Sequence, residues 1–180
     1  MKNLVLVGGA GGIGRSLAVR AFDEGWEVTV MDLEKSLINH PPKKGIETRN
    51  IDLKDHLSIS KAFAGFKSLS GLVNLAGFMH GLNSLENTTN EEFDEVLSVN
   101  FRGDFIIAKE TLPLLKLRGG SMVNVVSGLA SNVRPNYGIY GASKAGLINL
   151  TKTLALEAAP KVRVNAVGPS AVDTAFLRGG

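Results

Sequence analysis

The chain opens on an apolar run that leads directly into a cluster of glycines, and residues 4–14 read LVLVGGAGGIG. An apolar run of this kind is typical of a buried strand, and a helical pattern of apolar residues begins just after the glycines. A glycine-rich turn between a strand and a helix is the setting of the dinucleotide-binding fingerprint.

We expect Gly8 to form the tight turn. Gly11 and Gly12 would let the backbone approach a pyrophosphate, and Gly14 would allow close helix packing. The start of the helix adds partial positive charge for the anion. A turn with a purely structural role is the alternative for this run taken alone.

An acidic residue, Asp32, closes the second predicted strand, residues 27–31. A carboxylate at this position can accept both ribose hydroxyls of an adenosine, and it would repel a 2′-phosphate. The sequence therefore favours NAD over NADP. Two alternatives stay open: Arg15 lies near enough to attract a phosphate, and Asp32 could be a simple cap at the end of its strand.

Segments with strand and helix patterns alternate along the whole chain, and residues 34–44, which hold two prolines, read as a loop. The strands are short and apolar on both faces, as in parallel sheets that are buried on both sides. This alternation predicts an α/β fold, a Rossmann-like doubly wound parallel sheet in a single domain spanning residues 1–180. The long helix should begin at Thr89 or Asn90 as N-cap and should be kinked by Pro113. The strands are expected at residues 3–7, 27–31, 46–51, 71–75, 121–126 and 162–167, and the helices at residues 12–25, 56–66, 91–117 and 137–159.

The composition excludes several classes of function. The 180 residues are 44% hydrophobic and 21% charged, which fits one globular domain, and there is no cysteine for a disulfide, a thiolate zinc site or a thiol nucleophile. The formal net charge of +3 comes from scattered basic residues, so no nucleic-acid partner is expected. No stretch approaches the roughly 18 apolar residues of a membrane-spanning helix, so we expect no membrane partner and a cytoplasmic protein. The three histidines lack the spacing of metal ligands, so no metal site is expected.

A possible catalytic group lies in the last predicted helix, where Tyr140 and Lys144 are four residues apart. Residues at this spacing share a helix face, so an ammonium can sit beside a phenol. The phenol has an ordinary pKa of about 10, and a neighbouring cation would lower this pKa toward neutrality. Ser127, at the end of an apolar run, could hold the oxygen that the phenol protonates. This trio is suited to proton transfer at a carbonyl or alcohol oxygen.

These features together resemble the short-chain dehydrogenase/reductase family of the Ser-Tyr-Lys type, over residues 3–175. The first loop is similar to the Thr-Gly-x-x-x-Gly-x-Gly motif of the family, with Val7 in place of the threonine. Asp52 and Leu53 resemble its contact to the adenine ring. Residues 74–77, NLAG, resemble its Asn-Asn-Ala-Gly motif, with Leu75 in place of the second asparagine.

Two further motifs complete the resemblance. Asn100 falls where the family places a catalytic asparagine, and an ordinary residue on the surface of a helix is the alternative. Residues 168–174, GPSAVDT, resemble the family's Pro-Gly-x-Val-x-Thr segment, with Ser170 in place of the glycine. The chain ends soon afterwards, so the lid, last helix and last strand of the family are expected to be absent from these residues. Truncation or disorder of a longer tail is favoured over a naturally lidless protein as the explanation.

The resemblance implies an NAD(P)(H)-dependent oxidoreductase that transfers hydride between a nicotinamide and a small-molecule alcohol or ketone. Tyr140 would exchange the proton and Ser127 would position the oxygen. Lys144 would lower the pKa of Tyr140 and hold the nicotinamide ribose, and a water would link Asn100 to Lys144. Residues 78–80 and 129–136 would contact the substrate. The cofactor-binding residues implied are Gly8, Gly11, Gly12, Ile13, Gly14, Asp32, Asp52, Leu53, Asn74, Ala76, Gly77, Tyr140, Lys144, Pro169 and Val172.

Two expectations concern the protein as a whole. A non-catalytic dinucleotide-binding regulator or interaction module is the alternative function, because the expected lid is missing. The helix at residues 137–159 is apolar on most faces. The helix at residues 91–117 offers a similar outer surface formed by Phe101, Phe105, Ile106 and Leu112. The resemblance implies a homodimer or homotetramer formed through these two helices. Deeper burial within a single chain is the alternative explanation of these faces.

Overall fold

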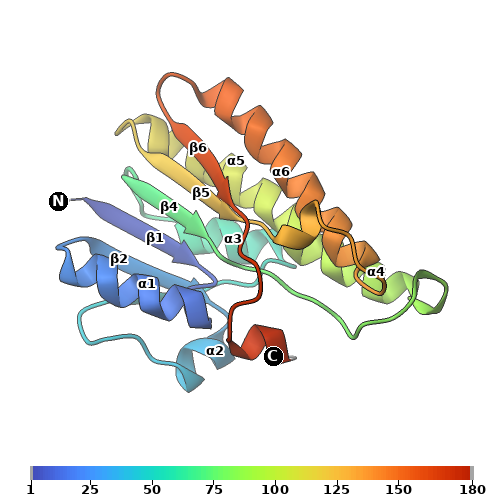
Figure 1. Cartoon of the computed structure of the whole chain (residues 1–180). Coiled ribbons are helices and arrows are strands. Elements are labelled where there is room, and N and C mark those ends of the chain that lie inside the picture. The colour runs from blue at the N-terminus through green and yellow to red at the C-terminus, as the bar shows by residue number, and fades with distance from the viewer. Residues whose placement is uncertain (1, 179–180) are drawn as a thin grey trace.

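A six-stranded sheet in which every strand pairing is parallel forms the centre of the structure, a computed structural model that describes residues 2–178 (Figure 1). The strand order is β3-β2-β1-β4-β5-β6. The predicted doubly wound parallel sheet is confirmed, and all six strands lie within two residues of their predicted bounds. The strands are β1 (Asn3–Val7), β2 (Glu27–Asp32), β3 (Glu47–Asn50), β4 (Gly71–Asn74), β5 (Ser121–Val125) and β6 (Arg163–Val167).

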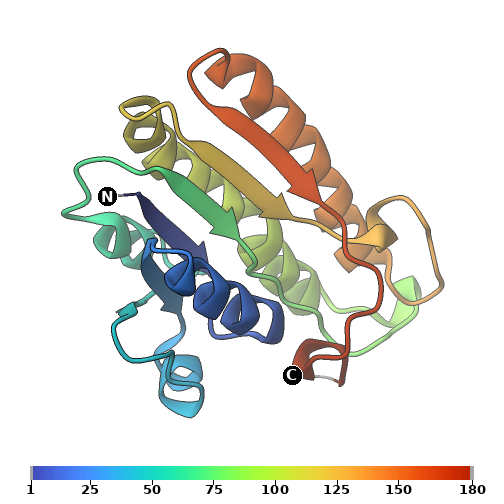
Figure 2. The same ribbon diagram turned by 60° about the vertical axis from the view of Figure 1, so that its left-hand side comes forward.

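Helices cover the two faces of this sheet unequally (Figures 1 and 2). Helix α1 packs on one face of the sheet, and α3, α5 and α6 pack on the other. No helix among residues 2–178 combines the length and the apolar composition needed to cross a membrane. The helices are α1 (Gly12–Asp23), α2 (Glu34–Asn39), α3 (His56–Phe63), α4 (Asn90–Leu97), α5 (Asp104–Lys116) and α6 (Gly138–Ala158), with short 3₁₀ turns at Leu85–Asn87, Gly128–Ala130 and Ala175–Arg178.

The first strand is apolar throughout because each of its faces meets a different helix layer. Val5 and Val7 belong to the core that includes Ile107 of α5, whereas Leu4 and Leu6 pack with Ala18 of α1. Successive side chains of a strand point to opposite faces, so a strand buried on both faces shows no polar alternation. Burying each of these valine and leucine side chains contributes about 1.5–3 kcal/mol relative to leaving it exposed.

The chain reverses its direction of travel across the sheet at β1. It adds β2 and β3 on one side of β1, and then β4, β5 and β6 on the other side. Beyond the ladder, the Leu75 amide still donates to the Val7 carbonyl at 2.8 Å, so the loops after β1 and β4 start side by side. Open α/β sheets bind ligands in the crevice outside the carboxyl ends of the strands at such a reversal.

One predicted loop is in part a helix. Residues 34–44 were expected to lie in a loop because of Pro41 and Pro42, but α2 occupies Glu34–Asn39. Glu34 lies in the first turn of α2, where a carboxylate is favourable at a helix N-terminus. The prolines follow the helix and only prevent its continuation.

The predicted long helix is interrupted, but not at its proline. Residues 91–117 form α4, a π-helical segment at Ser98–Gly103, and α5, which runs through Pro113 without a break. The expected N-cap is confirmed: Thr89 Oγ1 accepts from the Glu92 amide at 3.2 Å, and the Thr89 amide donates to Glu92 Oε2 at 2.9 Å. The irregular turn therefore lies in the middle of the helix, where it carries Asn100.

Candidate active site

The glycine turn packs directly against the loop that follows β4. Gly8 has a φ of +75°, and a Cβ built on it would lie 2.7 Å from the Ala76 nitrogen. A Cβ on Gly14 would lie 2.6 Å from the Gly9 Cα, so glycine is needed for α1 to approach the turn. Gly11 is the N-cap of α1, and it provides no side chain to cap the helix. The first amide groups of α1 are therefore available to an anion, and the turn fits a dinucleotide pyrophosphate.

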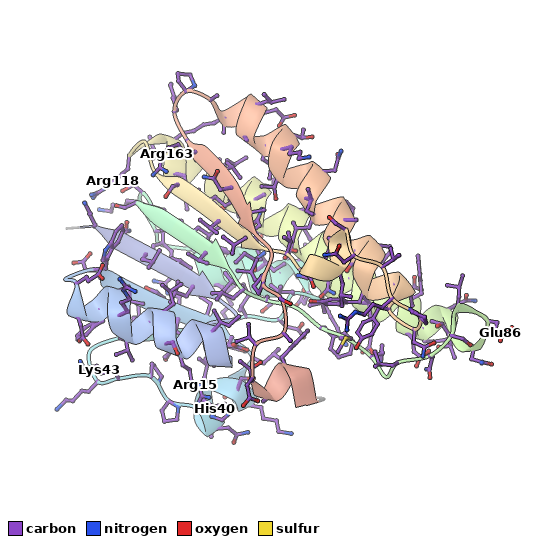
Figure 3. All side chains as sticks on the ribbon, viewed as in Figure 1. Arg15, His40, Lys43, Glu86, Arg118 and Arg163 are labelled. Atoms are coloured by element: carbon purple, nitrogen blue, oxygen red, sulfur yellow. The ribbon has the colours of Figure 1, made fainter. Side chains whose placement is uncertain are left out.

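Asp32 joins the end of β2 to this turn. Its Oδ2 accepts from the Ala10 amide at 3.0 Å, and its Oδ1 accepts from the Leu33 amide at 2.8 Å. The side chain is half-buried and lies at the carboxyl ends of the strands. Arg15 is engaged elsewhere, because its Nη1 lies 3.4 Å from Nδ1 of His40; the two side chains meet below α1 in Figure 3. The position of Asp32 fits a contact to the adenosine ribose.

The other two predicted nucleotide motifs each include a buried side chain. Leu53 lies in the hydrophobic core and packs against Gly103, where an added Cβ would come within 2.8 Å of the Leu53 Cβ. Asp52 is half-buried and accepts from the Lys54 amide at 2.9 Å. Asn74 is buried, and its Nδ2 donates to Asp104 Oδ1 at 2.6 Å. Of these side chains, that of Asp52 is the most open to a nucleotide.

Lys144 connects α6 with the ends of two strands. Its side chain is only 2% exposed, and its Nζ donates to the Ala76 carbonyl at 3.3 Å and to the Val125 carbonyl at 3.2 Å. Tyr140 lies one turn earlier on the same buried face of α6, as predicted from the spacing. The Ser127 side chain forms a hydrogen bond with Tyr140. The structure therefore brings Ser127, Tyr140 and Lys144 together at the carboxyl ends of β4 and β5.

The electrostatics of Tyr140 differ from the expected lowering by Lys144. Burial of the phenol raises the pKa of Tyr140 above its ordinary value, and the hydrogen bond from Ser127 only partly opposes this effect. Burial also lowers the pKa of Lys144, while the carboxylate of Asp104 opposes that shift. The expectation failed because spacing alone does not show that the phenol and the amine are both removed from water.

Asn100 is fully buried in the π-helical segment, so it is not a surface residue. Its Oδ1 accepts from the Phe78 amide at 2.7 Å, and its Nδ2 donates to the Phe78 carbonyl at 2.8 Å. The same Nδ2 donates to Ser143 Oγ at 3.2 Å. Both ends of the Asn100 amide therefore have protein partners, and the water expected to link Asn100 to Lys144 stays a prediction. Asn100 fastens the segment after β4 to α6.

A cavity of about 390 Å³ opens beside Tyr140. It lies between the segment after β4, helix α4 and the start of α6, and its wall includes Tyr137 and Tyr140. Of the segments expected to contact substrate, Met79, His80 and residues 134–136 line this cavity. Of Ser127, Tyr140 and Lys144, it is Tyr140 that lines this cavity.

An ionic network that the sequence did not suggest supports the rim of this cavity. Glu95 Oε2 lies 2.5 Å from His80 Nε2, and Glu95 Oε1 is paired with the Lys54 ammonium. Hydrogen bonds from Lys54 and then His80 lower the pKa of Glu95. The sequence alone suggests that Glu95 lies on a solvated helix face. Its partners, His80 and Lys54, come from other segments of the chain, so no local sequence pattern reveals this network.

The last described segment crosses the carboxyl ends of the strands toward α1 (Figures 1 and 2). The Pro169 carbonyl accepts from the Gly128 amide at 3.0 Å, next to Ser127, and Val172 is exposed. A Cβ on Gly12 would lie 2.5 Å from Thr174 Cγ2. The Phe176 ring lies 6.0 Å from that of Tyr140 between centroids, a contact that no motif predicted. This segment therefore borders both the glycine turn and the Tyr140 site.

Comparison with known proteins agrees with this geometry. The model of the short chain dehydrogenase family matches residues 2–179. A 3-oxoacyl-acyl-carrier-protein reductase of Staphylococcus epidermidis is 34% identical over 93% of this chain and 74% of its own. The structure of a 3-ketoacyl-(acyl-carrier-protein) reductase from Brucella melitensis complexed with NADH is 29% identical, with a TM-score of 0.88 over 99% of this chain and 79% of its own. The structure of an actinorhodin polyketide ketoreductase with NADPH is 28% identical, with a TM-score of 0.90 over 98% of this chain and 72% of its own. The chain therefore belongs to the short-chain dehydrogenase/reductase family of NAD(P)-dependent oxidoreductases, which act on alcohol and carbonyl groups.

Proposed function

We propose that Tyr140 is the proton donor and acceptor in the reduction of a small-molecule ketone and in the reverse oxidation of the alcohol. The observation that carries this proposal is the meeting of Ser127 and Lys144 with Tyr140, which lines a cavity that can hold a substrate. A bound nicotinamide dinucleotide supplies or accepts the hydride. The protein groups then manage the substrate oxygen and its proton.

Each group has a distinct task in this proposal. The Ser127 hydroxyl holds the substrate oxygen beside Tyr140, and the Tyr140 hydroxyl donates its proton to that oxygen as negative charge develops on it. The Lys144 ammonium lies one turn away on the same helix face, and its positive charge stabilises the phenolate that the transfer leaves behind, although burial keeps the pKa of the resting Tyr140 phenol above its ordinary value. Asn100 keeps the Phe78 backbone, and with it the wall of the site, fixed to α6.

The protonation state of Tyr140 determines which direction of the reaction the site favours at neutral pH. Because burial raises its pKa above the ordinary value, the phenol holds its proton at neutral pH and is ready to donate it. Reduction needs the protonated form at the start, whereas oxidation needs the phenolate. We therefore expect reduction to proceed at neutral pH and oxidation to require more alkaline conditions.

The preferred cofactor in our proposal is NAD. Asp32 lies at the end of β2 beside the glycine turn, where its carboxylate can accept from the ribose hydroxyls and would repel a 2′-phosphate. Arg15, the cation that could favour NADP, contacts His40. The two similar structures carry NADH in one case and NADPH in the other, so the choice depends on residues of this chain.

We also propose that the protein forms a homodimer or homotetramer. Phe101 is 38% exposed and Phe105 is 53% exposed on the outer side of the helix that holds the π-helical segment. The neighbouring α6 presents Ala142, Ala145 and Leu156 to solvent. Small residues beside aromatic ones allow helices from two subunits to pack closely.

Substitution of Tyr140 tests the proposed chemistry. Tyr140→Phe keeps the ring and removes the proton, so we expect kcat to fall by about 10²–10⁴-fold in an assay of ketones and alcohols with NADH and NADPH. Binding of NADH, measured by fluorescence titration, should change little because the glycine turn is unaltered. Tyr137→Phe is the matched control, since Tyr137 is the other tyrosine of the chain and also lines the cavity.

For Tyr137→Phe we expect kcat within a few-fold of the wild type, with any change confined to KM. Retained turnover in Tyr140→Phe, or an equal loss in both variants, would contradict the assignment of Tyr140.

A further inference from the structure

The site contains a buried acid that the proposed reaction does not use. Asp104 is the first residue of α5, directly after the π-helical segment, and its side chain is 3% exposed. Its Oδ1 accepts from Asn74 Nδ2 at 2.6 Å. Its Oδ2 is a buried polar atom without a hydrogen-bond partner among the described residues. A carboxylate in this position is costly unless another charge compensates it.

The compensating charge belongs to Lys144, and the Asn74 side chain and the Ala76 backbone connect the two groups. Asn74 joins them, because its Nδ2 donates to Asp104 while its Oδ1 accepts from the Ala76 amide at 3.2 Å. The carbonyl of the same Ala76 accepts from Lys144 Nζ at 3.3 Å. The ammonium of Lys144 is thus held by a backbone segment whose own position depends on Asn74 and Asp104.

The charges of these two groups depend on each other. Burial raises the pKa of Asp104 to about 7, while the charge of Lys144 and the hydrogen bond from Asn74 act in the opposite direction. Burial lowers the pKa of Lys144, and Asp104 is the charged group that opposes this. Among the elements around the pair, α6 contributes one further titratable group, Tyr140. The ends of β4 and β5 contribute the Asn74 side chain and backbone carbonyl groups, which do not titrate.

We propose that Asp104 is a positioning residue for this site, which keeps the Lys144 amine protonated and in place at the ends of β4 and β5. It acts through Lys144 and does not touch the substrate. This inference rests on the proposed role of Lys144 beside Tyr140. It also explains why a carboxylate occupies the apolar layer between the sheet and α5.

The effect of losing this carboxylate has a definite sign. In Asp104→Asn, burial acts on Lys144 without opposition, so the pKa of Lys144 falls further and the ammonium loses its proton at a lower pH. Carbonyl reduction needs the ammonium and the protonated phenol. We therefore expect the alkaline limb of the kcat/KM profile for ketone reduction to move to lower pH, by on the order of one unit.

Asp94→Asn is the matched control for this measurement. Asp94 lies on α4 and is exposed, so its loss changes the net charge equally without reaching Lys144. Its profile should coincide with that of the wild type. A profile of Asp104→Asn that also coincides with the wild type would overturn the proposal.

A second measurement needs no substitution of Asp104 and no activity. The side-chain carboxyl of Asp104 can be titrated by carbon-13 NMR in the wild type and in Lys144→Met. Without the ammonium, the pKa of Asp104 should rise further, because only the hydrogen bond from Asn74 then opposes the effect of burial. An unchanged pKa would overturn the proposal even if Asp104→Asn fails to fold.

The two proposals can fail separately. Retained turnover in Tyr140→Phe contradicts the proposed function, yet the NMR titration still tests the interaction of Asp104 with Lys144. An unchanged titration together with an inactive Tyr140→Phe contradicts only the role of Asp104.

Discussion

A single carboxylate, that of Asp32, determines the preferred dinucleotide in our proposal. Asp32→Asn keeps the size of the side chain and an oxygen that can accept from the Ala10 amide, but it removes the negative charge. We expect the ratio of kcat/KM with NADH to kcat/KM with NADPH to fall by about tenfold, equivalent to about 1.4 kcal/mol. Steady-state rates with both cofactors and one ketone substrate give this ratio.

Asp23→Asn serves as the control for this charge change. Asp23 is the last residue of α1 and pairs with Lys43, at the end of the helix remote from the glycine turn. The cofactor ratio of this variant should equal that of the wild type. If Asp32→Asn also leaves the ratio unchanged, another residue selects the cofactor.

At the scale of elements, the π-helical segment is held in place by a glycine. A Cβ on Gly103 would lie 2.8 Å from the Leu53 Cβ and 3.1 Å from the Leu53 carbonyl oxygen. Gly103→Ala should therefore lower the free energy of unfolding by about 1–3 kcal/mol, because the backbone around Leu53 must shift. Chemical denaturation of the wild type and the variant measures this difference.

A glycine in open space provides the comparison. A Cβ on Gly81 meets no atom within 4 Å, so Gly81→Ala should leave the free energy of unfolding within about 0.5 kcal/mol of the wild type. An equally small effect of Gly103→Ala would show that the contact with Leu53 does not fix the segment.

The elements that the sequence predicted well are those with a strong local signal. The apolar strands and the cap at Thr89 each depend on a few neighbouring residues, and the structure confirms them. Helix α2 was missed because Pro41 and Pro42 masked one short helical turn. The π-helical segment was missed because helical periodicity does not reveal the close packing of Gly103 against Leu53, a residue distant along the chain.

At the scale of the whole molecule, the sequence likewise predicted the local features of the site but not those that depend on packing between distant segments. The spacing of Tyr140 and Lys144 places them on one helix face from sequence alone, and their meeting with Ser127 follows from the parallel sheet. The burial of Asp104 and the raised pKa of Tyr140 depend on how the sheet, α5 and α6 pack together. A sequence shows which groups can titrate, whereas their removal from water is a property of the assembled fold.

The exposed aromatic side chains of the long helix concern the assembly of whole molecules. Ile106 and Leu112, expected to join an outer apolar face, instead pack against the core, whereas Phe101 and Phe105 stay exposed. Phe105→Glu would place a charge in the proposed interface between subunits, where burial of an unpaired carboxylate is unfavourable. Size-exclusion chromatography with light scattering should show a dimer or tetramer for the wild type and a smaller species for Phe105→Glu.

The control for this experiment is an exposed apolar side chain on another helix. Ile38 of α2 is 70% exposed. Helix α2 lies near β3 at one edge of the sheet, whereas α6 packs beside β6 at the other edge, so Ile38→Glu should leave the assembly intact. The comparison separates a specific interface from a general effect of added charge on association, because both variants change the net charge equally. A monomeric wild type, or an unchanged mass for Phe105→Glu, would assign the exposed phenylalanines to the surface of a single chain.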